Sequence, residues 1–275
     1  ALEDYAPKNT RTVFTLNSFM GYTLADLSPR YALLFMKKAV AITRIRPELD
    51  TGARFHLLGA IAGLHKGLQE PDSARVWYQQ ACAEAFARYK APGQASSLNN
   101  LGVFYSSLGR SDSAMHYFYA ALNVLGGIQY DTILYCSIQD NIAQQYENKG
   151  DYAYALNTYR FNDLMFNSRK RWNRILVNRI RLLNAEHRAG YPDSEVSLGI
   201  EQLADWVEQH RANLLDEDVL QFYHFAKDFF LEMGRLAALR RFDPLFTTMK
   251  DSIKQKNKEQ IDLITGRQRH VSGLF

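Results

Sequence analysis

The side chains that could carry catalysis or bind a metal are scattered along this chain. None of the seven histidines has a cysteine or carboxylate partner at metal-ligand spacing; they are His56, His65, His116, His187, His210, His224 and His270. The sequence contains no G-x-x-x-x-G-K-[ST], G-x-G-x-x-G, H-E-x-x-H or G-x-S-x-G motif. We interpret Gly126-Gly127 as a helix end rather than a phosphate loop. We therefore predict no catalytic residue, no metal site and no cofactor, and hence a protein that is not an enzyme.

The two cysteines, Cys82 and Cys136, fall in different segments that are rich in apolar residues. A disulfide needs α-carbons within about 7 Å of each other, and two non-equivalent helix positions do not favour that distance. We expect buried free thiols. Two such cysteines leave the redox compartment open.

The chain is mildly basic, with 33 Lys and Arg against 29 Asp and Glu, and a formal net charge of +4. This balance is not by itself a nucleic-acid signature, and we expect no nucleic-acid partner. The cations gather in two groups. These are Arg169, Lys170, Arg171, Arg174, Arg179, Arg181 and Arg188, and then Lys250, Lys254, Lys256, Lys258, Arg267 and Arg269. Each group is either a solvated helix face or a contact for an anionic partner or membrane surface.

The elements that must position these residues are helices, because small and large side chains recur at a fixed period and strand signals are absent. Four alanines recur about every 40 residues: Ala32, Ala74, Ala114 and Ala155. A large side chain follows each of them by four residues, at Met36, Tyr78, Phe118 and Tyr159. A small residue precedes three of them by twelve, at Ala62, Gly102 and Ala143, with Met20 as the exception. Such self-similarity is typical of stacked helix pairs, which approach closely where small side chains meet.

Two copies of the pattern are especially clear. They are Leu101-Gly102-x-x-Tyr105-x-x-x-Gly109-x-x-x-x-Ala114-x-x-x-Phe118-x-x-Ala121-Leu122 and Ile142-Ala143-x-x-Tyr146-x-x-x-Gly150-Asp151-Tyr152-x-x-Ala155-x-x-x-Tyr159. Gly109 and Gly150 stand where the first helix must stop, and glycine accepts the left-handed conformation used there. The pattern resembles the tetratricopeptide repeat (TPR). Its period exceeds the usual 34 residues and is similar to that of the long-helix TPR variants of bacterial regulators.

The resemblance implies an all-α fold, a right-handed α-solenoid of five to six antiparallel helix pairs. We expect one array over residues 1–275, with clear repeats at 52–167 and weaker ones at 11–45 and 169–263. The expected pairs are 11–26 with 29–45, 52–67 with 71–89, 93–108 with 111–126, 130–149 with 152–167, 169–189 with 193–212, and 216–233 with 235–263. Pro244 should kink or interrupt the last helix.

The resemblance also implies that the first helices line a concave groove for a protein or peptide ligand. Carried over position by position, the partner contacts are Asn99, Asp140, Gln144, Asn148 and Arg181. The basic flank around Arg174 and Arg181 favours an acidic ligand and salt-sensitive binding.

The expected function is a non-catalytic binding module, the sensory or regulatory region of a larger bacterial signal-transduction protein. The alternatives are a stand-alone TPR adaptor, an accessory regulator of a phosphorelay or transcription factor, and an enzyme or phosphatase accessory on a TPR scaffold. The start, Ala1-Leu2-Glu3-Asp4, has neither an initiator methionine nor a signal peptide and is typical of an excised piece. The charged tail, residues 249–260, resembles the segment that follows the last repeat in bacterial sensor proteins. No 18-residue apolar run predicts a membrane span; an extracytoplasmic location is favoured over a cytoplasmic one, with the compartment unknown.

Overall fold

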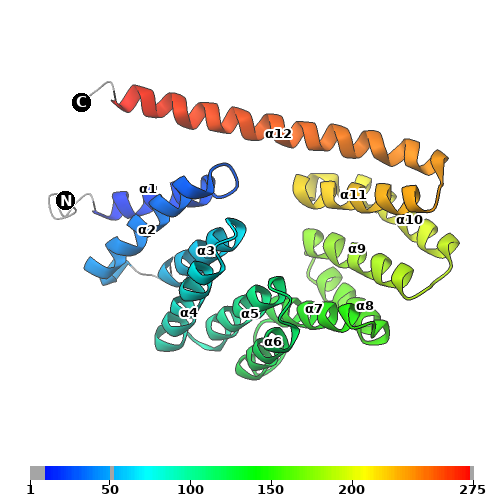
Figure 1. The fold of residues 1–275 in the computed structure, drawn as a ribbon, viewed down its shortest axis with the longest axis horizontal. Coiled ribbons are helices and arrows are strands. Elements are labelled where there is room, and N and C mark those ends of the chain that lie inside the picture. Colours follow the sequence, from blue (N-terminus) through cyan, green and yellow to red (C-terminus); the bar gives the residue numbers. More distant parts are fainter. Residues whose placement is uncertain (1–9, 50–52, 273–275) are drawn as a thin grey trace. The chain divides into compact units, whose positions relative to one another are not determined.

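The computed structural model describes residues 10–49 and 53–272, so Ala1–Asp4 lie outside the described residues. Helices account for 86% of the described part, which contains no strand (Figure 1). The α-helices are α1 (Thr10–Thr23), α2 (Pro29–Ile45), α3 (Ala53–Gly67), α4 (Pro71–Arg88), α5 (Ala91–Ser107), α6 (Ser111–Leu125), α7 (Thr132–Asn148), α8 (Tyr152–Ser168), α9 (Trp172–Arg188), α10 (Asp193–His210), α11 (Asp216–Glu232) and α12 (Leu236–Ser272). Short 3-10 turns, η1 (Pro47–Leu49) and η2 (Arg211–Asn213), follow α2 and α10. The all-α repeat of helix pairs is confirmed.

Turn chemistry sets the helix boundaries. Pro29 and Pro71 are the first residues of α2 and α4, where the missing N–H removes no helical hydrogen bond. Gly109 and Gly150 have φ of 70° and 85° at the ends of α5 and α7. In both turns the second residue beyond the helix donates its N–H to a carbonyl inside the helix, as a left-handed C-cap requires.

The chain divides into two compact units, Ala1–Ile138 and Gln139–Phe275. In the first unit, α2, α3 and α4 enclose one apolar cluster, and α3 to α6 enclose another. The aromatic rings of Tyr78 and Phe104 lie 5.4 Å apart in the second cluster. The single array over residues 1–275 stays a prediction.

Close helix contacts occur where the small residues of the repeat predict them. A β-carbon at Gly102 of α5 would lie 2.4 Å from the Phe118 ring of α6. Ala143 of α7 is fully buried with Ala155 and Tyr159 of α8. In the first pair, where Met20 is the exception to the pattern, the neighbouring Gly21 makes the close approach to Met36.

The second unit has an apolar cluster at α7, α8 and α9 and a larger one that joins α9 to α12. In its fifth helix pair, α9 with α10, a β-carbon at Gly199 of α10 would lie 2.4 Å from Leu183 of α9. Here the glycine is on the second helix and the large residue is on the first. The contact of a small residue with a large one is therefore present, with the two helices exchanged.

The last helix, α12, passes through Pro244 without ending, so the predicted interruption is wrong, while the alternative, a kink, stays a prediction. The proline removes one backbone donor, but side chains on both sides of it are held by packing. Phe242 is fully buried, and Phe246 and Met249 pack against the same cluster. Tertiary contacts with α11 thus override the local effect of proline.

The prediction for the cysteines can also be compared with the structure. Neither Cys82 nor Cys136 is in a disulfide, and Cys136 is buried while Cys82 is partly buried. His65 is buried, with its Nδ1 2.6 Å from Glu70 Oε2 and its ring stacked beside Trp77. His65 is therefore packed in the interior of the first unit.

Candidate partner-binding site

The predicted groove residues fall in both units. Asn99 lies on α5 in the first unit, where its side chain is half-buried. The other four belong to the second unit, three of them on α7 and one on α9. Gln144 and Asn148 are exposed on α7, Arg181 is partly exposed on α9, and Asp140 is buried.

Asp140 is a buried carboxylate that orients Arg181. The Arg181 guanidinium donates to Asp140 Oδ2 at 3.2 Å, and Asn162 of α8 donates to Asp140 Oδ1 at 2.5 Å. Burial raises the pKa of Asp140, while Arg181 and Asn162 act in the opposite direction. Asp140 therefore fixes the position of Arg181 from below the surface.

A second buried carboxylate, Glu147, was missed by the sequence reasoning. It accepts hydrogen bonds from Arg188 at 2.7 Å and from the Tyr159 hydroxyl at 3.1 Å, with Asn184 at 3.4 Å. Burial and the charge of Glu147 raise the pKa of Tyr159. The sequence carries a signal for this second pair in a matched spacing. Asp140 and Glu147 are seven residues apart on α7, and Arg181 and Arg188 are seven residues apart on α9.

Arg181 of the first pair, and Asn184, which bonds to Glu147, line a pocket of about 850 Å³ within the second unit. It runs along the first helices of three successive pairs, α7, α9 and α11, and α12 supplies one wall. Its lining residues are Gln144, Ile180, Arg181, Asn184, His187, Glu217, Leu220, Gln221, His224, Phe225, Asp228, Phe229, Glu232, Phe246 and Lys250. Of the predicted contacts in this unit, Gln144 and Arg181 line the pocket and Asp140 and Asn148 do not.

The pocket carries charges of both signs around an apolar floor. Carboxylates come from Glu217, Asp228 and Glu232, and cations from Arg181 and Lys250. His224 Nδ1 lies 2.8 Å from Asp228, and the His224 ring meets the edge of Phe246. Such a lining offers hydrogen bonds and apolar contact together, and its own charges do not favour an acidic ligand over a neutral one.

The basic residues of α9 do not form a single solvated face. Arg179 pairs with Asp163 at 3.0 Å, and Arg181 and Arg188 pair with the buried carboxylates of α7. Trp172 and Trp206 pack against each other, with ring centroids 6.2 Å apart, beside the α9–α12 cluster. The cations of the C-terminal half of α9 are thus part of the internal structure.

Two searches bear on other kinds of site. Within residues 10–49 and 53–272, no group of three or more His, Cys, Asp or Glu side chains is placed to hold a metal ion. In the same part of the chain, none of the helices has both the length and the apolar composition that crossing a membrane requires.

Comparison with known proteins identifies the repeat. Residues 95–124, which cover most of α5 and most of α6, match the tetratricopeptide repeat family model. No curated protein sequence matches the chain significantly.

Three solved structures illustrate the fold. BtubC (BKLC) from P. vanneervenii is 14% identical with a TM-score of 0.65, over 82% of this chain and 92% of that one. A Rap protein complexed with Competence and Sporulation Factor is 17% identical with a TM-score of 0.64, over 92% of this chain and 66% of that one. The Rap conjugation gene regulator of plasmid pLS20, in complex with the Phr* peptide, is 16% identical with a TM-score of 0.61, over 95% and 79%. At these identities the likeness concerns the fold.

Proposed function

We infer that this chain, a tetratricopeptide-repeat protein by its repeat sequence and its helical fold, is a non-catalytic module that binds a protein or peptide segment. The observation that carries this inference is the pocket along α7, α9 and α11. First helices of successive pairs supply its polar contacts, so neighbouring repeats act on one ligand. An elongated ligand suits a surface built from repeated elements.

The chemistry of the pocket supports a peptide segment as ligand. Gln144 and Gln221 are exposed amides that can donate to and accept from a peptide backbone. Phe225 and Phe246 offer apolar area for a side chain of the ligand. Two proteins of similar fold were crystallised with a peptide or a named factor, which supports the same class of ligand here.

The proposed contacts are Gln144 and Arg181 from the pocket, with Asn148 farther along α7. Asn99 remains a proposed contact of the first unit. Asp140 acts through Arg181, because its buried carboxylate holds the guanidinium in place. An acidic ligand would be attracted by Arg181 and Lys250 and repelled by the three carboxylates that line the pocket.

We further propose a sensory or regulatory role in a larger bacterial signal-transduction protein. Helix α12 supports this proposal, because Phe246 and Lys250 line the pocket and the same helix continues to Ser272. A bound ligand would therefore contact the helix that leads away from the last repeat. A stand-alone adaptor, or a regulator of a phosphorelay or transcription factor, uses the same pocket and stays the alternative.

The test is a pull-down with two matched double variants. Gln144→Ala/Gln221→Ala removes two exposed amides from the pocket. Gln202→Ala/Gln209→Ala removes two exposed amides from α10, the second helix of its pair. We expect partners of the wild type to stay with the α10 variant and to be lost by the pocket variant. If both folded variants retain every partner, the proposed site is wrong.

A further inference from the structure

A second pocket of the same unit, with a volume of about 510 Å³, lies at the turn between α8 and α9. Three cations line it, Lys170 and Arg171 from the turn and Arg174 from the first turn of α9. The remaining lining residues are Trp172, Asn173, Val177, Asn213, Leu215 and Asp218. The pocket therefore joins the start of α9 to the segment that leads into α11.

The cations of this pocket differ from the other basic residues of α9. Farther along the helix, Arg179, Arg181 and Arg188 each form an ion pair with a carboxylate. In the described part of the chain Lys170, Arg171 and Arg174 form none, and all three are exposed. Arg174 acts on Asp218 only at longer range, where it opposes the rise that burial causes in the pKa of that carboxyl.

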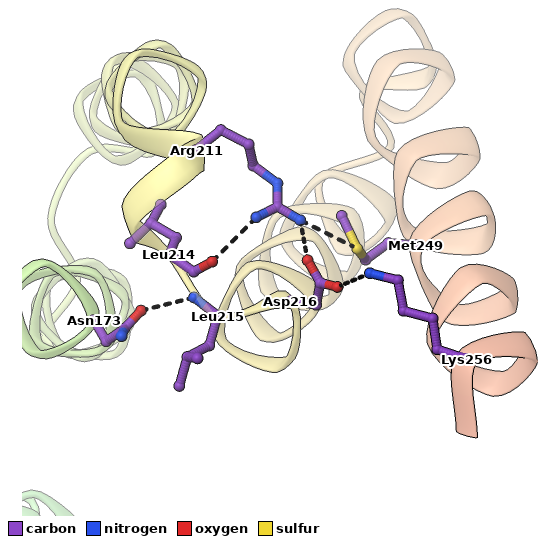
Figure 2. Close-up of polar contacts among 7 residues, drawn as sticks. All are labelled: Asn173, Arg211, Leu214, Leu215, Asp216, Met249 and Lys256. Atoms are coloured by element: carbon purple, nitrogen blue, oxygen red, sulfur yellow. Dashed lines mark hydrogen bonds and ion pairs between the residues drawn. The ribbon is translucent and has the colours of Figure 1, made fainter. Parts of the chain in front are cut away.

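One wall of the pocket is the segment around Leu215, which hydrogen bonds hold in place (Figure 2). The backbone N–H of Leu215 donates to Asn173 Oδ1 at 2.9 Å, which ties the wall to α9. Arg211 donates to the Leu214 carbonyl at 3.2 Å and also contacts Asp216. Lys256 of α12 reaches the other oxygen of Asp216 at 2.6 Å. Because Leu215 is bonded to Asn173 across the pocket, its two sides are already joined before a ligand arrives.

Two features of the local backbone are unfavourable where these cations gather. Lys170 has a φ of 51°, in the region where the matching turns carry Gly109, Gly150, Gly190 and Gly234. Helix α9 has no acidic residue in its first turn, whereas α6 has Asp112 there. Cations near a helix N-terminus oppose the helix dipole. A bound anion would offset both effects. What indicates a ligand, however, is the presence of three cations around a formed pocket.

The charge of the pocket indicates the ligand. Three cations and the single carboxylate of Asp218 leave two positive charges in excess. A phosphate group carries about −1.5 to −2 at pH 7 and offers three strong acceptor oxygens, and arginine suits it as a forked donor. We propose that this pocket binds a phosphate group, as free phosphate or as a small phosphate monoester. The proposal concerns a site separate from the peptide pocket and does not depend on it.

The experiment is a titration of the folded chain with inorganic phosphate, followed by calorimetry or ³¹P NMR at constant ionic strength. Glycerol phosphate forms a second arm and succinate, a dicarboxylate, a third. We expect phosphate binding that each of Arg171→Gln and Arg174→Gln weakens about tenfold, the loss of one charge-assisted contact. Asp218→Asn should tighten binding several-fold. Tighter binding of glycerol phosphate would identify an ester as the ligand, and equal binding of succinate would overturn the assignment to phosphate.

Two matched controls separate the pocket from an ordinary helix start. Arg110 is the N-cap of α6, with φ −88° and ψ 70°, and Arg171 is the N-cap of α9, with φ −88° and ψ 69°. Arg110→Gln should leave phosphate binding unchanged, and a loss equal to that of Arg171→Gln would overturn the proposal.

The second control uses the left-handed residues. Lys170→Gly should weaken phosphate binding while it keeps or raises the melting temperature, because glycine relieves the turn. Gln69→Gly, at φ 60° in the α3–α4 turn, should keep or raise the melting temperature with no change in binding. A Lys170→Gly variant that binds phosphate as well as the wild type would contradict the role of this lysine.

Discussion

Replacing Gly102 by alanine is the sharpest test of how the helix pairs pack. In an ordinary helix interior the change would stabilise the chain by about 0.5–1 kcal/mol, because glycine loses more backbone freedom on folding. At Gly102 the new β-carbon would lie 2.4 Å from Phe118 Cε1 and 2.5 Å from Cδ1. Phe118 is 1% exposed, so its ring has little room to move. Overpacking of this kind costs about 1–3 kcal/mol, and the net result should be a loss of about 0–2.5 kcal/mol.

The control is Gly59→Ala in α3, where a β-carbon meets nothing nearer than the Asn100 amide at 3.8 Å. That variant should gain about 0.5–1 kcal/mol. The two variants should therefore differ by about 1–3 kcal/mol in the free energy of unfolding. Urea unfolding, followed by circular dichroism at 222 nm, measures both. If Gly102→Ala stabilised the chain as much as Gly59→Ala does, the close contact with Phe118 would be refuted.

Three further predictions concern the second unit. Lys256 and Arg211 hold the pKa of Asp216 below its usual range. The stability that this carboxylate contributes is therefore present above the unfolded-state pKa of about 3.9. It is lost as pH falls through the lower folded-state pKa. The melting temperatures of wild type and Asp216→Asn should accordingly differ at neutral pH and converge below about pH 4; a constant difference would contradict this. Glu147→Ala should lower the free energy of unfolding by about 1–3 kcal/mol, because it leaves the buried Tyr159 hydroxyl without its acceptor, and adding Tyr159→Phe should then cost little more. Pro244→Ala should raise the melting temperature, because it restores a backbone donor inside α12; an unchanged or lower value would show that α12 is adapted to its proline.

Most of the helix boundaries could be predicted because they depend on local chemistry. The left-handed glycines and the prolines at helix starts placed the turns to within a few residues. The contacts inside a pair were harder where the pattern changed. The close contact at Gly199 was not predicted, because its large partner, Leu183, comes before it in the sequence instead of after it. Pro244 does not end α12, because the local effect of proline is outweighed by the burial of Phe242.

The candidate site was less predictable, because a pattern of exposed positions does not show which charges pair inside the fold. Asp140 lies at a groove position of its helix, but its carboxylate points to Asn162 and Arg181 and is buried. The basic residues of α9 formed one group in the sequence. In the structure they separate into Arg179, Arg181 and Arg188, which form ion pairs, and Lys170, Arg171 and Arg174, which form none in the described part of the chain. Only the three-dimensional positions of the carboxylates on α7 and α8 make that division.

The two ion pairs between α7 and α9, whose carboxylates are buried, limit how freely the repeats can be exchanged. Asp140 with Arg181 and Glu147 with Arg188 are each 41 residues apart, so each pair joins similar positions of successive repeats. Gly190 and Gly234 place the next repeat 44 residues on. In a chimaera from which the fifth repeat is cut, Phe225 would replace Arg181 and Glu232 would replace Arg188. Both carboxylates of α7 would lose their cations, and one would face a second acid. The order of these repeats is therefore encoded in their buried charges, and this segment is a poor place for recombination.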